Sequence, residues 1–243
     1  AVDAPFRPDS LIEIRAGNFV IFDLGTNLTG FPAVKLSCRE KARLFFTFDE
    51  ILTDGDVDFK RLDCVSLVGW EAEPGDYTLE TLEPYTLRYL KVMVMKGQVA
   101  VSGTQLREYA NPLASLARFA ASDSRLNILF EAARQNYRQN AVDIFMDCPS
   151  RERAGWLCDS YFTARAEQTF CGGHEVEKSF LENYLRPERY PNIPDGMLPM
   201  CYPSDSHNGT YIPNWAMWFV LELEEYAARG GDRQLIAPIL NEL

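Results

Sequence analysis

The sequence predicts an antiparallel β-sandwich followed by a domain of α-helices. Two observations carry this prediction. Apolar residues recur at every second position up to about Tyr109, and they recur at helical spacing after Asn111 and Pro112. A block of strands followed by a block of helices is typical of two domains and not of one interleaved α/β sheet. We therefore expect a β domain over residues 1–110 and a helical domain over residues 111–243.

The strand pattern is clearest in two segments, where one face is apolar and the other is mixed. The apolar positions are Ala42, Leu44, Phe46 and Phe48 in the first segment and Leu90, Val92 and Val94 in the second. Residues between them, such as Arg43 and Lys91, are expected to point outward. Turn signals are expected at Gly25, Asp54 with Gly55, Pro74 with Gly75, and Lys96 with Gly97, a spacing that favours an antiparallel sandwich.

The helical pattern begins after an N-cap signal at Ser122 and Asp123. The apolar stripe that follows consists of Leu126, Leu129, Phe130, Ala133 and Tyr137. Three further helices are expected over residues 156–170, 176–185 and 215–228. Glycine pairs at 172–173 and 230–231, and Pro187, are expected to end them.

Composition excludes several classes of function. The chain has 243 residues, with 35 acidic and 24 basic residues and a net charge of −11, which disfavours binding to nucleic acid. No uncharged apolar run reaches about 18 residues, so no membrane insertion is expected. The six cysteines are spread singly, and we expect buried free thiols. The sequence leaves the oligomeric state and the compartment open, although a periplasmic or extracellular location is favoured over a cytoplasmic one.

The densest polar cluster lies between Asp147 and Asp159, where three carboxylates, two guanidinium groups and an indole fall within thirteen residues. Pro149 disfavours helix at the preceding residue, so a loop is expected there before a helix begins. If that helix started early, Glu152, Trp156 and Asp159 would share one face, because they are spaced i, i+4 and i+7. The three side chains are expected to converge with either helix start.

This convergence suits the hydrolysis of a glycosidic bond. That reaction needs a carboxylic acid that stays protonated near neutral pH, and the charges of Asp147 and Asp159 would raise the pKa of Glu152. Arg151 and Arg153 would act in the opposite direction if both pointed inward, so at least one must face a sugar hydroxyl or a structural partner. The alternative is a solvated helix start, in which acidic residues complement the helix dipole and pair with arginine in water.

Three segments of the chain resemble bacterial α-L-rhamnosidases of glycoside hydrolase family 78. Residues 147–159 are similar to the DCP-x-R-E-R-x-GW-x-x-D signature of that family. Residues 22–30 resemble the FD-x-G-x-N-x-x-G segment of its concanavalin-like β-sandwich, and Tyr211 to Trp215 followed by Gly231 and Asp232 resemble its aromatic helix and GD turn. The resemblance implies an antiparallel concanavalin-like β-sandwich followed by part of an (α/α)6 barrel.

The resemblance also implies a role for each matching residue. Glu152 occupies the position of the family's general acid, and Asp147 and Asp159 match carboxylates that bind rhamnose hydroxyls and tune that acid. Arg151 and Trp156 match neighbours in the sugar pocket. Trp215 and Tyr211 are expected to line the same pocket. The expected partner is a rhamnose-containing oligosaccharide or glycoside, and no cofactor is expected.

The chain departs from the family pattern in length. A complete barrel needs about twelve helices of ordinary length, whereas five or six can be drawn in this sequence. The family inverts stereochemistry with a second carboxylate that activates water, and this base is expected beyond Leu243. Ser150 and Cys158 stand where glutamine and glycine are common. The alternative function is therefore a carbohydrate-binding or structural fragment without catalysis.

Two other kinds of site are disfavoured by spacing. Cys171 with His174, and Cys201 with His207, do not form the paired clusters that structural zinc prefers, so no metal site is expected. Cys148 as a nucleophile would need a convergent histidine, and neither histidine is near it in the sequence.

Overall fold

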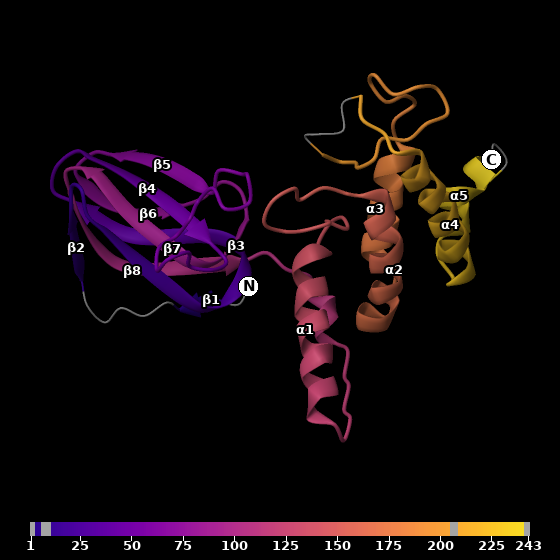
Figure 1. Cartoon of the computed structure of the whole chain (residues 1–243), viewed down its shortest axis with the longest axis horizontal. Coiled ribbons are helices and arrows are strands. Elements are labelled where there is room, and N and C mark those ends of the chain that lie inside the picture. Colours follow the sequence, from indigo (N-terminus) through magenta and orange to yellow (C-terminus); the bar gives the residue numbers. More distant parts are fainter. Residues whose placement is uncertain (1–2, 6–10, 205–208, 241–243) are drawn as a thin grey trace. The chain divides into compact units, whose positions relative to one another are not determined.

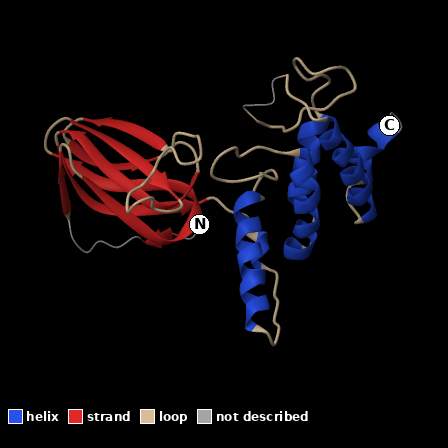
Figure 2. Ribbon diagram, in the orientation of Figure 1, coloured by secondary structure: helices blue, strands red, loops and turns tan. Residues whose placement is uncertain are grey.

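A computed structural model of the chain describes residues 3–5, 11–204 and 209–240 (Figure 1). It divides into two compact units, Ala1–Tyr109 and Ala110–Leu243. The first unit is built of strands and the second of helices (Figure 2). The predicted order of a strand block followed by a helix block is confirmed.

The first unit is an antiparallel sheet of eight strands in the order β1-β8-β3-β7-β4-β5, with β2 added at β8 and β6 added at β3. The strands are β1 (Asp3–Pro5), β2 (Ile12–Arg15), β3 (Phe19–Cys38), β4 (Ala42–Asp49), β5 (Leu67–Ala72), β6 (Gly75–Glu80), β7 (Tyr85–Lys96) and β8 (Gln98–Glu108).

The long strand β3 turns this sheet into a sandwich. Its first part, from Phe19 to Gly30, pairs with β7, whereas its second part, from Ala33 to Cys38, pairs with both β6 and β8. A strand that belongs to two portions of a sheet lets the inner faces of those portions pack on each other. Buried residues of both portions accordingly form one apolar core.

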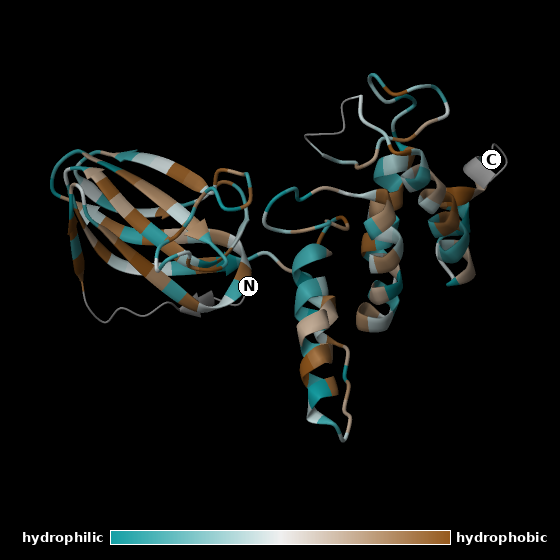
Figure 3. Cartoon of the chain, viewed as in Figure 1, coloured by the Kyte–Doolittle hydropathy of each residue, from teal (hydrophilic) through white to brown (hydrophobic). Residues whose placement is uncertain are grey.

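The alternation predicted for β4 and β7 is confirmed on the apolar face, and Figure 3 shows the hydropathy of these strands. All seven predicted apolar positions are buried. Lys91 was expected to face solvent, and this expectation is wrong, since its side chain is buried although it is not part of the apolar core. Its Nζ donates to both carboxylate oxygens of Asp56 at 2.7 Å and lies 3.9 Å from the centre of the Phe19 ring. A buried ammonium is tolerated when it is paired in this way.

Gly25 does not separate two strands, contrary to the sequence-based expectation. It lies inside β3, at a register shift between Asp23 and Leu28, with a φ of 80°. The Asp23 carboxylate accepts a hydrogen bond from the Gly25 N–H at 2.7 Å, and it forms an ion pair with Arg88. The glycine therefore supplies a left-handed residue at a bulge in a continuous strand.

The second unit contains a short 3₁₀ helix, η1, and five α-helices in its described part. They are η1 (Leu113–Ser115), α1 (Ser124–Asn140), α2 (Leu157–Cys171), α3 (Glu175–Leu185), α4 (Pro213–Ala228) and α5 (Arg233–Leu240).

Most of the predicted helix ends are correct. Asp123 is the N-cap of α1 and accepts a hydrogen bond from the Arg125 N–H, and Gly172 ends α2 in the left-handed conformation. α4 begins two residues earlier than expected, because Pro213 suits the first turn of a helix. α5, which follows the turn at Asp232, was not predicted.

The apolar stripe predicted for α1 is buried only in part. Tyr137 is buried and Phe130 packs on Phe170, but Leu126 and Leu129 are 48% and 65% exposed. The core of the unit instead gathers where α2, α3 and α4 meet, around residues such as Phe180 and Leu223. None of the described helices has the length and apolar character needed to span a membrane.

Candidate active site

Residues 147–156 form a loop between α1 and α2, here called the acid loop. The loop closes on itself at its base, since the Asp147 N–H donates to the Ala154 carbonyl and the Asp147 carboxylate accepts from the Ala154 N–H, both at 3.1 Å. Inside it, the Arg153 N–H donates to the Cys148 carbonyl at 3.2 Å, and Arg153 has a φ of 51°. Asp147 is therefore fixed both by its backbone and by its side chain.

The end of the acid loop is held against a second loop around Tyr202. The Tyr202 N–H donates to the Gly155 carbonyl at 2.9 Å, and the Leu157 N–H donates to the Met200 carbonyl at 3.3 Å. A Cβ atom on Gly155 would lie 2.3 Å from the Tyr202 carbonyl oxygen. The glycine of the GW pair is therefore required by the close approach of two backbones.

The possible early start of the following helix is not observed. α2 begins at Leu157, with Trp156 as its N-cap residue in an extended conformation. Glu152 and Trp156 consequently lie in the loop, and they do not share a helix face with Asp159. The close approach at Gly155 accounts for this, since residues 155–157 pair with the Tyr202 loop.

Asp147 and Asp159 line one cavity of about 390 Å³ between α1 and α2. The other lining residues are Ala133, Asn136, Tyr137, Asn140, Met146, Phe162, Thr163, Ala166 and Phe170. Partial burial raises the pKa of Asp159 above its usual value, and the negative charges of Asp147 and Glu152 raise it further. Asp159 is therefore within electrostatic reach of both other carboxylates of the cluster.

Glu152 and Arg151 form an ion pair with each other. Both side chains are open to solvent, with 32% and 49% of their surfaces exposed. The Glu152 backbone N–H also donates to the Cys148 sulfur at 3.3 Å. At least one arginine was expected to face a sugar hydroxyl or a structural partner, and Arg151 faces the acid in this structure.

The three aromatic residues predicted for the sugar pocket lie outside the cavity between Asp147 and Asp159. Trp156 pairs with Cys201 in an isolated bridge, and Trp215 packs against the core of the helical unit. The indole N–H groups of both tryptophans are buried without a hydrogen-bond partner. Tyr211 is 41% exposed, just before α4. The structure therefore places Asp147 and Asp159 on one cavity, whereas neither Glu152 nor the three aromatic residues line it.

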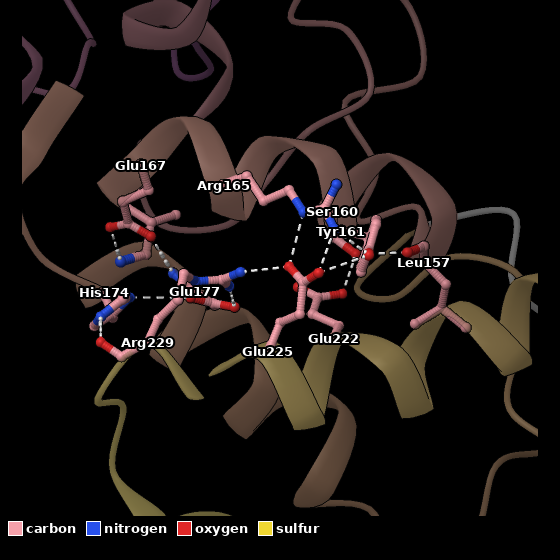
Figure 4. A network of polar contacts seen from close by, with 11 residues as sticks. Leu157, Ser160, Tyr161, Arg165, Glu167, His174, Glu177, Glu222, Glu225 and Arg229 are labelled. Atoms are coloured by element: carbon pink, nitrogen blue, oxygen red, sulfur yellow. Dashed lines mark hydrogen bonds and ion pairs between the residues drawn. The ribbon is translucent and has the colours of Figure 1, made fainter. Parts of the chain in front are cut away.

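Two groups of residues near this site were not predicted from the sequence. Asn136 and Asn140 of α1 line the cavity, and their i, i+4 spacing is a signal that could have placed them on one helix face. The second group is a partly buried network between α2, α3 and α4, shown in Figure 4. It includes Glu167, Glu177, Glu222, Glu225 and Arg229. A glutamate within the apolar helical segment around Glu222 was the available signal.

The cysteines do not form a reactive site. All six are free, but only Cys38 and Cys201 are buried, so the expectation of buried thiols is correct for two of them. Burial raises the pKa of the Cys148 and Cys158 thiols, which keeps them protonated and weakly nucleophilic. Among the described residues no cluster of three metal-ligating side chains occurs, and His207 lies outside the described residues.

Comparison with known proteins places this loop and its helices in one family. Residues 114–243 match the bacterial α-L-rhamnosidase 6 hairpin glycosidase domain. The chain is 25% identical over 197 residues to an α-L-rhamnosidase of Alteromonas sp. (strain LOR), covering 76% of this chain and 20% of that protein. It is 25% identical over 210 residues to an α-L-rhamnosidase of Formosa agariphila, covering 83% of this chain and 22% of that protein. The chain spans about a fifth of the length of these relatives.

Solved structures share the fold. A rhamnosidase from Klebsiella oxytoca with rhamnose bound superposes with a TM-score of 0.76 at 20% identity, over 92% of this chain and 46% of that one. A family GH78 rhamnosidase of Bacillus sp. GL1 gives a TM-score of 0.78 at 24% identity, over 91% of this chain and 23% of that one. The match to residues 114–243 covers more than half of the sequence, and the chain therefore belongs to the bacterial α-L-rhamnosidase 6 hairpin glycosidase domain family.

Proposed function

We propose that the protein containing this chain is an inverting glycoside hydrolase that removes terminal α-L-rhamnosyl residues from rhamnosides. The observation that carries the proposal is the cluster of Asp147, Glu152 and Asp159, in which the pKa of Asp159 is raised by burial and by the other two charges. Perturbed carboxylates beside a cavity are typical of catalytic sites. Membership of the rhamnosidase family supports the choice of sugar.

In this proposal Glu152 is the general acid that protonates the departing glycosidic oxygen. Asp147 and Asp159 bind rhamnose hydroxyls from the wall of the cavity that they share. Trp156, Trp215 and Tyr211 lie outside that cavity, so in this proposal they contact the sugar only beyond it. Inversion also requires a carboxylate that activates water, at about 6.5–9.5 Å from the acid. We assign this base to a part of the enzyme outside these 243 residues, since the chain spans only a fifth of its relatives.

The ion pair of Arg151 with Glu152 adds a step to this mechanism. A guanidinium group beside a carboxylate favours the charged form, whereas a general acid must hold its proton when the sugar binds. Arg151 must therefore leave Glu152 and bind sugar hydroxyls in the complex. This rearrangement costs little, because an exposed ion pair contributes only about 0–1 kcal/mol.

The acid is tested with Glu152→Gln in the full-length enzyme. Turnover of rhamnosides with poorly activated leaving groups is expected to fall by about 10²–10⁴-fold, because general acid catalysis contributes that much. Rhamnose affinity, measured by calorimetry, is expected to stay nearly unchanged. Glu175→Gln, on the exposed surface of α3, is the matched control. Unchanged turnover of the Glu152 variant contradicts the assignment.

The second candidate function is a carbohydrate-binding fragment without catalysis. It is favoured because the chain spans only about a fifth of the length of its relatives. The two functions are separated by giving residues 1–243 an aryl α-L-rhamnoside and, in parallel, titrating it with rhamnose by calorimetry. Binding without turnover supports the second function for this chain. Turnover by this chain alone supports the first and shows that the base lies within it.

A further inference from the structure

The hydroxyl group of Ser160 lies between two oxygen atoms in the interior of the helical unit. Its Oγ is 2.7 Å from the carbonyl oxygen of Leu157 and 2.6 Å from Oε2 of Glu222. Ser160 and Glu222 are both completely buried. Figure 4 shows this contact between the start of α2 and the middle of α4. Both distances are those of real O–H···O hydrogen bonds.

Two hydrogen bonds at this hydroxyl need two protons. A serine hydroxyl has one proton to donate, and a backbone carbonyl has none. If Glu222 were ionised, Ser160 could satisfy only one of its two neighbours. The other pair of oxygens would then face each other at hydrogen-bonding distance without a proton. Both contacts are satisfied when Glu222 carries a proton, donates it to Ser160, and Ser160 donates to Leu157.

The surroundings of Glu222 favour the same state. Its Oε1 has no hydrogen-bond partner, and an ionised carboxylate would leave that charged oxygen bare in the interior. The groups that face it are Glu177 and Tyr184 from α3, Glu225 from its own helix and Arg229 just after that helix, and the α2 side contributes Ser160. Arg229 is already paired with Glu177 and Glu225. Burial therefore raises the pKa of Glu222 well above its usual value, and the charges of Glu177 and Glu225 add to this effect.

We propose that Glu222 carries a proton at neutral pH and serves as a positioning residue for the first turn of α2. The chain of donors runs from Glu222 through Ser160 to the carbonyl of Leu157, so α4 holds that turn in place. The same turn contains Asp159, whose carboxylate lines the cavity with Asp147. The consequence for sugar binding rests on the proposed function, whereas the proton and the positioning do not.

The proton is tested first by infrared spectroscopy of the whole chain at pH 7. The wild-type spectrum minus that of Glu222→Gln is expected to contain the carbonyl band of a protonated carboxyl group, shifted in D₂O. Glu182→Gln, which removes a partly exposed glutamate paired with Arg186, is the control and is expected to remove only carboxylate bands. Absence of the protonated band from the wild-type difference spectrum overturns the proposal.

The second test is the pH dependence of unfolding. An amide at position 222 can donate to Ser160 as the acid does, but it cannot ionise. The unfolding equilibrium constant of the wild type is therefore expected to rise relative to Glu222→Gln by up to about tenfold per pH unit above pH 5. A ratio that does not change with pH contradicts a proton held in the folded state.

The positioning role is tested by the titration of Asp159, followed by NMR of carbon-13-labelled aspartate side chains. The pKa of Asp159 is expected to match the wild type in Glu222→Gln, where the donor is kept, and to shift in Ser160→Ala, where both hydrogen bonds are lost. Identical titration of Asp159 in all three proteins overturns the positioning role. None of these measurements depends on rhamnose turnover, so their failure is distinguishable from a failure of the proposed function.

Discussion

Gly155 is the residue on which the shape of the acid loop depends most directly. We expect Gly155→Ala to destabilise the helical unit by about 1–3 kcal/mol, because the new Cβ would lie 2.3 Å from a backbone oxygen of Tyr202. Chemical denaturation of the whole chain measures this loss. The comparison variant is Gly173→Ala, since nothing lies within 4 Å of a Cβ at that position. Equal stabilities of the two variants would show that the loops can separate without cost.

Asp159 is held in the folded state at an electrostatic cost. Its pKa is raised by burial and by Asp147 and Glu152, so its ionised form is disfavoured in the folded protein relative to the unfolded chain. The free energy of unfolding therefore decreases as the pH rises above 3.8, the usual pKa of an aspartate side chain. We expect Asp159→Asn to be more stable than the wild type at pH 7, by less than about 1 kcal/mol because the side chain is partly exposed.

Thermal unfolding at two pH values checks the Asp159 prediction. The advantage of the asparagine variant is expected to disappear near pH 3, where the carboxyl group of the wild type is protonated in both states. A stability difference that is the same at both pH values would mean that packing, and not charge, separates the two proteins. Rhamnose affinity of Asp159→Asn is expected to fall if Asp159 binds the sugar.

At the scale of single residues the sequence identifies the acidic cluster but not its electrostatics. The grouping of Asp147, Glu152 and Asp159 follows from their closeness in the chain. The approach of Tyr202 to Gly155 could not be predicted, because it joins segments about fifty residues apart, and it delays the start of α2. Because α2 begins only at Leu157, Glu152 lies in a loop, where it pairs with Arg151. Asp159 is instead the acid whose pKa is raised by the negative charges of the other two.

Among the helices, α3 depends on a cap supplied by another element. Both carboxylate oxygens of Glu167 in α2 accept hydrogen bonds at 2.8 Å, one from the Val176 N–H and one from the Glu177 N–H. These are free donors at the start of α3. We expect Glu167→Ala to cost about 1–3 kcal/mol, because two buried N–H groups lose their acceptors.

Denaturant unfolding of Glu167→Ala, compared with Gln168→Ala, measures the value of this cap. Gln168 is exposed on the same helix and controls for the change in helix propensity. Hydrogen exchange of the Val176 and Glu177 amides is expected to accelerate in the first variant only. Unchanged exchange there would show that other acceptors replace Glu167.

Local signals predicted where most of the helices lie, but they did not show which contacts from other elements hold the helix ends. Asp123 and Gly172 were predicted as helix ends from a few residues of sequence, and the structure uses both. α3 has no side-chain cap of its own, and its cap, Glu167, comes from the preceding helix. The outward face expected for Lys91 failed for the same kind of reason, since Asp56 lies 35 residues away.

For the whole molecule, the change of periodicity near residue 110 was enough to predict two kinds of structure in the correct order. Each unit has its own apolar core. The exposure of Leu126 and Leu129 on α1 could not be predicted, because a periodic stripe shows which residues prefer burial and not whether the described chain supplies a surface to cover them.

The two units should respond differently to pH. The buried glutamates Glu167, Glu177 and Glu222 all lie in the helical unit, and burial raises the pKa of each, that of Glu167 to about 7. A carboxyl group with a raised pKa contributes its full stabilisation below pH 4.5, the usual pKa of glutamate. This contribution is lost as the pH rises through the pKa of the group in the folded state. In the described part of the sheet unit the shifted carboxyl groups, Asp23 and Asp56, have lowered pKa values and stay ionised above pH 5.

Calorimetric unfolding of the whole chain between pH 5 and pH 8 is therefore expected to show one transition that falls with rising pH and one that stays nearly constant. Tryptophan fluorescence assigns the falling transition to the helical unit, because Trp156, Trp215 and Trp218 lie there and Trp70 is alone in the sheet unit. The sheet transition serves as the internal control. A helical transition that rises with pH would require the buried glutamates to be ionised and paired in the fold, which the unpartnered oxygen of Glu222 argues against.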